Sequence, residues 1–161
     1  MSTSIQDLVL LGDSRLYESC SEVTKQDIEL IPRWTQDLHS VIEAIREQYG
    51  FGRGIAAPQL GIMKRFIYIN INNPWVLINP EIIEASEDMF EMWDDCMSLP
   101  SLLVKVKRHQ KITVRYTDID WNIQEVNAEN DLSELLQHEI DHLNGILCTM
   151  RAINNKSFKW K

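Results

Sequence analysis

The sequence predicts an α+β fold in which antiparallel strands pack around a C-terminal helix, with one long helix nearer the N-terminus. Apolar residues recur at helical spacing in two segments, and short β-rich segments lie between them. These strands follow one another too closely for crossover helices, which argues against a doubly wound parallel sheet. The length of 161 residues is typical of one domain, so we expect a single domain over residues 1–161.

The first predicted helix covers about residues 30–49. Pro32 suits its first turn, where the missing N–H is no loss, and Gly50 is a suitable stop. Its apolar residues follow spacings of three and four and form the expected core face: Ile31, Trp34, Leu38, Val41, Ile42, Ile45 and Tyr49.

The segment between the helices is predicted to contain short strands at residues 66–69, 75–78, 111–116 and 123–126, with a turn at 118–122. A Gly-rich segment at residues 50–59 precedes them. It follows a helix rather than a strand, so it is not a dinucleotide-binding loop. Its glycines allow another backbone to approach closely, and Gln59 is the one amide side chain that it delivers.

The second predicted helix covers about residues 132–143. Asp131 is expected to cap it, with Glu134 three residues later as in a capping box. Asn144 and Gly145 form the expected stop. The apolar face consists of Leu132, Leu135, Leu136 and Leu143.

This second helix contains the strongest chemical signal in the chain. His138 and His142 are four residues apart, so both imidazoles leave the same face of the helix, one turn apart. Glu139 lies beside the first histidine, close enough to handle the proton of a water molecule. This is the HExxH pattern of metal-dependent hydrolases.

A catalytic metal site needs a third protein ligand and one open position. No Asp or Glu follows His142, and position 148 is Cys148, for which a small buried thiol is the simplest interpretation. We therefore expect the third ligand upstream, with Cys96 supplied by a loop as the candidate. The alternative for Cys96 is a packed core thiol, and Cys20 is expected to be an uninvolved loop residue.

Composition excludes several other classes of protein. A net charge of −8 argues against binding to a phosphate backbone, so no nucleic-acid partner is expected. No apolar run approaches the ~18 residues of a membrane span, and the first residues lack the features of a signal or transit peptide. Three cysteines do not indicate a disulfide framework, so cytoplasmic localisation is the default expectation.

Three motifs together resemble those of the polypeptide deformylase family, GxGxAAxQ, EGCLS and HExDH. Residues 52–59 match the first motif and residues 138–142 match the third at their fixed positions. The second motif is divergent, because residues 94–98 keep only Cys96 and Ser98. The order of the motifs also agrees, so the resemblance covers nearly the whole chain.

The resemblance implies a metal-dependent hydrolase that removes the N-formyl group from N-formylmethionyl peptides and releases formate. One divalent ion would be held by Cys96, His138 and His142, with Fe²⁺ as the native ion and Zn²⁺ or Ni²⁺ as substitutes. Glu139 would act as general base and then general acid. The side chain of Gln59 and the backbone N–H of Met97 would form the oxyanion hole.

The resemblance further implies partners and a substrate pocket. The substrate would be a nascent chain, with the ribosome as a further partner, and the protein would be a monomer that contacts no membrane. Six residues are expected to bind the substrate: Gly52, Arg53, Gly54, Ile55, Glu134 and Leu135.

Several positions depart from the family pattern. Asp94 is one methylene shorter than the family's Glu, and Asp95 replaces a Gly. Many deformylases have an Arg shortly after the position of Pro100, and residues 101–104 contain none. Arg53 and Glu134 occupy positions where apolar residues would suit a methionine pocket, and we predict that they pair across its mouth.

These departures leave two alternatives to an ordinary deformylase. One is an amide hydrolase on the same scaffold that acts on other formylated or acylated substrates. The other is a catalytically silent domain that binds peptide termini. Gln59 and Glu139 argue against the silent domain, because metal binding alone would not need them.

Overall fold

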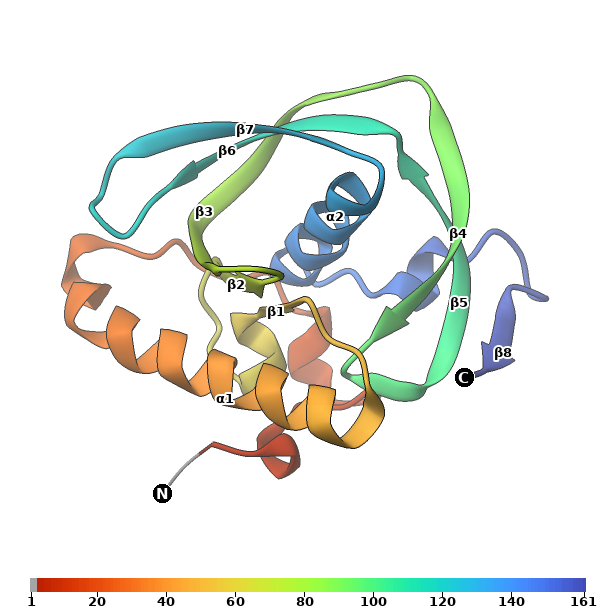
Figure 1. The fold of residues 1–161 in the computed structure, drawn as a ribbon, viewed down its shortest axis with the longest axis horizontal. Helices are drawn as coiled ribbons and strands as arrows, with labels where there is room; N and C mark the ends of the chain where they lie inside the picture. The colour runs from red at the N-terminus through yellow and green to blue at the C-terminus, as the bar shows by residue number, and fades with distance from the viewer. Residues whose placement is uncertain (1–2) are drawn as a thin grey trace.

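The computed structural model describes residues 3–161 and has the predicted α+β fold, with two long helices and two antiparallel sheets (Figure 1). The helices are α1 (Ile31–Tyr49) and α2 (Asp131–Leu143). The strands are β1 (Gly54–Ala56), β2 (Phe66–Asn70), β3 (Pro74–Ala85), β4 (Met89–Cys96), β5 (Leu99–His109), β6 (Lys111–Thr117), β7 (Ile123–Glu129) and β8 (Phe158–Trp160). Short 3₁₀ turns lie at Ile5–Asp7, Ser14–Tyr17, Lys25–Leu30, Ala57–Leu60 and Cys148–Arg151.

The larger sheet contains five strands in the order β1-β2-β3-β6-β7, and every neighbouring pair is antiparallel. The four strands expected from the sequence all belong to it. Strand β3 is longer than expected and shifts register twice along β6. Such irregularities bend a strand, which agrees with the strong curvature of β3 over α2 in Figure 1.

The smaller sheet, in the order β4-β5-β8, was not expected from the sequence. Strand β4 exposes or half-exposes most of its residues, so its apolar pattern is weak. The sequence placed Cys96 in a loop, and this is wrong: Cys96 ends β4 and pairs with Leu99 across the tight turn into β5.

Helix α1 begins and ends as the sequence predicts. Pro32 lies in the first turn, and Gly50 takes a left-handed φ of 72° at the C-terminal end. The face formed by Trp34, Leu38 and Ile42 is buried against β1 and β2. The helix therefore covers one side of the larger sheet and holds the Gly-rich segment that follows it.

Helix α2 is enclosed by both sheets and contacts β1, β3 and β7 of one and β5 of the other (Figure 1). Its predicted start is wrong in detail. Asn130 is the N-cap, Asp131 is already helical, and no side chain caps the helix. Glu134 is buried and pairs elsewhere, because the helix lies inside the fold rather than on its surface. Across the described residues, neither helix has the length and apolarity needed to cross a membrane.

Candidate metal centre

Helix α2 directs His138 and His142 to one point inside the protein. Both side chains are buried, and their Nε2 atoms are 3.2 Å apart. The spacing of four residues places them on the same face, as the sequence predicts. With both Nε2 atoms unprotonated, two imidazole nitrogens this close can bind the same metal ion.

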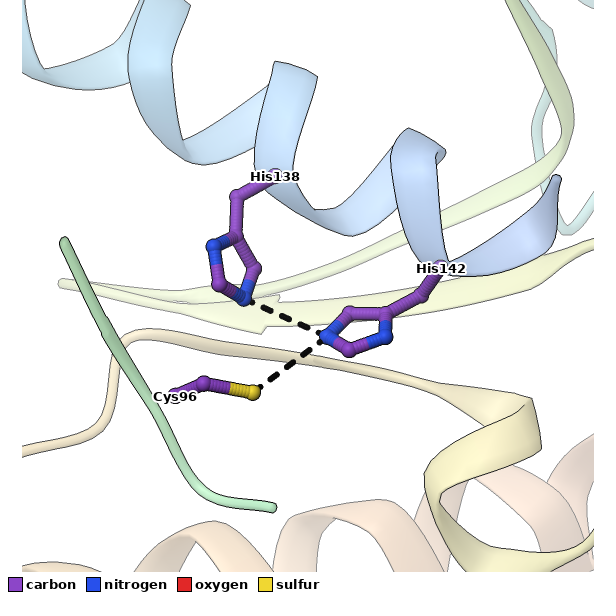
Figure 2. Close-up of side chains that lie close together, drawn as sticks. All are labelled: Cys96, His138 and His142. Carbon is purple, nitrogen blue, oxygen red and sulfur yellow. Dashed lines mark hydrogen bonds between the residues drawn. The ribbon is translucent and has the colours of Figure 1, made fainter. Parts of the chain in front are cut away.

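The end of β4 brings Cys96 to the same point. Its Sγ lies 3.4 Å from His142 Nε2, and the three ligand atoms all lie within 4.8 Å of one another. Figure 2 shows both rings pointing from the helix toward the cysteine on the facing segment. The register of β4 and β5 shifts between Asp94 and Cys96, which turns the thiol toward α2.

These three donors fit a tetrahedral metal site. Bonds of about 2.0–2.1 Å to nitrogen and 2.3 Å to sulfur place neighbouring ligands about 3.3–3.6 Å apart. The observed separations of 3.2 Å and 3.4 Å are close to these values. One thiolate and two neutral imidazoles leave a fourth position for water, as catalytic sites require.

The orientation of His138 is fixed by Asp94. The Asp94 Oδ2 atom accepts a hydrogen bond from His138 Nδ1 at 2.8 Å, which leaves the Nε2 lone pair directed at the site. Although Asp94 is shorter than the family's Glu, it reaches this partner. Burial raises the pKa of Asp94, but His138 and Arg108 outweigh burial and hold this pKa at about 2.

Arg108 connects Asp94 to the helix. This buried side chain donates to Asp94 Oδ2 at 2.9 Å and to Asp141 Oδ2 at 2.7 Å. Asp141 also accepts two hydrogen bonds from Arg151, so it supports the ligand helix and does not face the metal. Sequence reasoning missed Arg108, although its alternation with Val104 and Val106 along β5 marks an inward-facing position.

Two potential catalytic side chains lie next to the ligands. Glu139 is buried, and burial raises its pKa to about 7, so this carboxyl group can both accept and donate a proton near neutral pH. Its Oε2 atom has no partner among the described residues. Gln59 accepts a hydrogen bond from the Ala56 N–H at 2.9 Å, while its Nε2 lies 3.1 Å from Ser98 Oγ and 3.6 Å from Cys96 Sγ.

One recess of about 260 Å³ opens onto these groups. Of the predicted site residues, it is lined by Gly52, Arg53, Gly54, Gln59, Cys96, Met97, Glu134, Leu135, His138 and Glu139. His142 lies behind it, and Ile55 is fully buried in the hydrophobic core rather than in its wall. Two larger hollows of about 750 Å³ lie elsewhere on the described surface and contain none of the metal donors.

Two glycines of the Gly-rich segment, Gly52 and Gly54, line this recess where a side chain would be crowded. A Cβ at Gly52 would lie 2.9 Å from Met97 Cε, and the φ of Gly52 is +126°. A Cβ at Gly54 would lie 3.2 Å from Ile69 and 3.5 Å from Glu139. Gly54 therefore allows the backbone to approach α2 closely, and Gly52 allows it to pass close to Met97, as the sequence analysis expects of this segment.

Arg53 and Glu134 form the predicted ion pair in the recess wall. The Glu134 side chain is 4 % exposed and the Arg53 side chain 39 %. Burial raises the pKa of Glu134, and Arg53 opposes that rise. Asp95, the other charged departure near Cys96, pairs with Lys161 at 3.0 Å.

Comparisons with known proteins agree with this fold and site. The sequence profile of the polypeptide deformylase family matches residues 5–158. A peptide deformylase from Dictyoglomus thermophilum is 36% identical over 150 residues, covering 92% of this chain and 94% of its own.

Solved structures give the same result. A peptide deformylase from Synechococcus elongatus, in complex with actinonin, is 33% identical, with a TM-score of 0.85 over 93% of this chain and 80% of its own. A Met-Ala-Ser-bound class I type b peptide deformylase from Acinetobacter baumannii is 28% identical, with a TM-score of 0.80, and the match covers 89% of this chain and 96% of that chain.

The site and fold thus define a metal-dependent hydrolase. The chain belongs to the polypeptide deformylase family. The alternatives of a different acyl substrate and of a catalytically silent domain are not favoured by these similarities.

Proposed function

We propose that this chain uses Cys96, His138 and His142 to bind one divalent ion and removes the N-formyl group from N-formylmethionyl peptides, releasing formate. The observation that carries the proposal is the convergence of these three donors, two of which, Cys96 and His138, line the same recess as the buried Glu139. We propose Fe²⁺ as the native ion, with Zn²⁺ or Ni²⁺ as substitutes, since one thiolate and two imidazoles suit all three.

The residues around the ion can perform the hydrolysis. When bound, the ion lowers the pKa of water from about 15.7 toward 7 and so supplies a nucleophile at neutral pH. Glu139 takes the proton of that water and later delivers it to the departing amine, and its pKa of about 7 suits both roles. We assign Gln59 Nε2 and the Met97 backbone N–H to the formyl oxygen, where negative charge develops.

Gln59 is held ready for this role. Its Oε1 atom is fixed by the Ala56 N–H, so the amide NH₂ is directed toward Cys96 and Ser98. Of its two N–H bonds, one is donated to Ser98, and the other, which faces Cys96 Sγ at 3.6 Å, would be donated to the formyl oxygen.

We further propose that Gly52, Arg53, Gly54, Glu134 and Leu135 contact the substrate, with Ile55 supporting them from the core. The physiological substrate would be a nascent chain at the ribosome. The protein itself would be a cytoplasmic monomer with one domain over residues 1–161. The net charge of −8 supports contact through the emerging peptide rather than through ribosomal RNA.

The experiment is to measure formate release from formyl-Met-Ala-Ser by anaerobically purified, Fe²⁺-loaded protein, with Glu139→Ala in parallel. We expect release by the parent protein and a loss of about 10²–10⁴-fold in the variant, because proton transfer is removed. Metal content is measured in both. No release from a fully loaded parent would contradict the proposal, and equal rates would contradict the role of Glu139.

A further inference from the structure

The recess beside the metal donors contains a charged wall as well as the catalytic groups. Cys96 and His138 line it together with Arg53 and Glu134. Glu134 lies one turn before His138 on α2, which places the two Cβ atoms roughly 5–6 Å apart. The first residue of a formyl peptide is bonded directly to the formyl nitrogen, so a formyl group at the metal donors would place that residue's side chain in the same recess as this pair.

The ion pair is a fixed feature of the wall. Glu134 is buried, so separating it from Arg53 would leave an unpaired carboxylate out of contact with water. Burial lowers the pKa of Arg53, but the adjacent Glu134 raises it above its usual value, so the guanidinium stays charged. A substrate side chain in the recess would therefore contact the intact, charged Arg53–Glu134 pair.

Arg53 retains unused hydrogen-bond donors. Only its Nη2 donates to a described residue, Glu134, although a guanidinium carries five N–H bonds, and the side chain is 39 % exposed. A thioether is a weak acceptor and would cover these N–H groups without satisfying them, which is unfavourable. An oxygen at the end of the side chain would satisfy them.

The charge of the wall favours a neutral oxygen over a carboxylate. Arg53 is already balanced by Glu134, and the nearby Asp95 and Asp131 add negative charge. Lys161 balances only Asp95. An acidic substrate side chain would meet no uncompensated positive charge here.

We propose that this recess selects N-formyl peptides whose first side chain has the length of methionine and ends in a neutral hydrogen-bond-accepting oxygen. In a nascent chain that begins with methionine, this side chain is methionine sulfoxide. Glutamine has the same length and carries an equivalent oxygen. The inference rests on the proposed deformylase function and specifies its substrate class.

The test compares kcat/KM of the Fe²⁺-loaded protein for four substrates. The substrates are formyl-Met-Ala-Ser and its sulfoxide, and the analogues that begin with norleucine and glutamine. Two doubly substituted proteins are compared with the parent. Arg53→Val/Glu134→Leu removes both charges together, so neither is left buried alone. Arg115→Val/Glu125→Leu removes a matched, exposed Arg–Glu pair on β6 and β7, away from the recess.

We expect the parent and the control to cleave the sulfoxide and glutamine peptides at least as efficiently as the thioether and norleucine peptides. In the Arg53→Val/Glu134→Leu variant, the ratio of kcat/KM for the oxygen-bearing peptides to kcat/KM for the apolar peptides should fall about tenfold or more. An unchanged ratio in that variant, or a preference of the parent for methionine over its sulfoxide, would overturn the inference alone. Absence of formate from all four peptides would instead refute the proposed function.

Discussion

Replacing Arg108 with Met tests whether the buried ion pairs of Arg108 with Asp94 and Asp141 hold α2 against the β4-β5-β8 sheet. Arg108 is 2 % exposed and bridges Asp94 at 2.9 Å and Asp141 at 2.7 Å. Removing one partner of a buried pair typically costs about 3–5 kcal/mol, because the remaining charge is uncompensated. His138 and Arg151 still contact the two carboxylates, so we expect about 3 kcal/mol.

The assay is urea unfolding of the metal-free protein, followed by circular dichroism. With a slope of about 2 kcal/mol per molar urea, the midpoint should fall by about 1.5 M. Arg115→Met is the control. Its side chain is 48% exposed, and we expect a change within about 0.5 kcal/mol.

Metal affinity gives an independent measurement on the same variant. Asp94 orients His138, and Arg108 holds Asp94, so we expect metal affinity to fall about 10–100-fold in a chelator competition. A stability loss below about 1 kcal/mol together with unchanged affinity would refute the reasoning, because it would mean that neither carboxylate depends on Arg108.

Three further predictions concern single residues. Gly145→Ala should destabilise the protein by about 2 kcal/mol or more in thermal unfolding, because the φ of Gly145 is +71° and the new Cβ would lie 2.5 Å from Tyr17 O. Gly12 also has a positive φ but has open space around it, so the control Gly12→Ala should cost about 1–2 kcal/mol. Equal losses of stability in the two variants would contradict the clash with Tyr17. Gln59→Leu should slow formate release about 10²–10³-fold with metal content unchanged, whereas an unaltered rate would exclude its amide from the reaction. Cys20 is buried and its pKa is raised to about 11, chiefly by burial, so it should resist alkylation at pH 8 until urea is added; rapid labelling of the native protein at Cys20, located by mass spectrometry, would contradict this.

The elements that sequence reasoning could predict are those with local patterns. The periodic apolar residues of α1 and the i, i+4 histidines of α2 depend only on neighbours along the chain. The pairing of Arg53 with Glu134 was predicted from two charges at positions expected to be apolar, and it is confirmed.

The parts that could not be predicted depend on contacts between distant segments. Arg108 joins Asp94 to Asp141, and no local pattern links these three positions. Strand β4 is partly exposed and rich in acidic residues, so it lacks the apolar alternation of a strand. Glu134 fits a capping box by spacing, but burial and Arg53 determine its actual position.

The donors of the metal site come from two separately hydrogen-bonded parts of the fold. Cys96 belongs to the β4–β5 hairpin, while His138 and His142 belong to α2, which lies between the two sheets. An ion bound by these three residues would act as a cross-link between the two parts, and the complete ligand set would exist only once the hairpin has docked. Opening of that hairpin alone would remove Cys96 from the ligand set without global unfolding, so the rate of metal loss would be sensitive to a local motion.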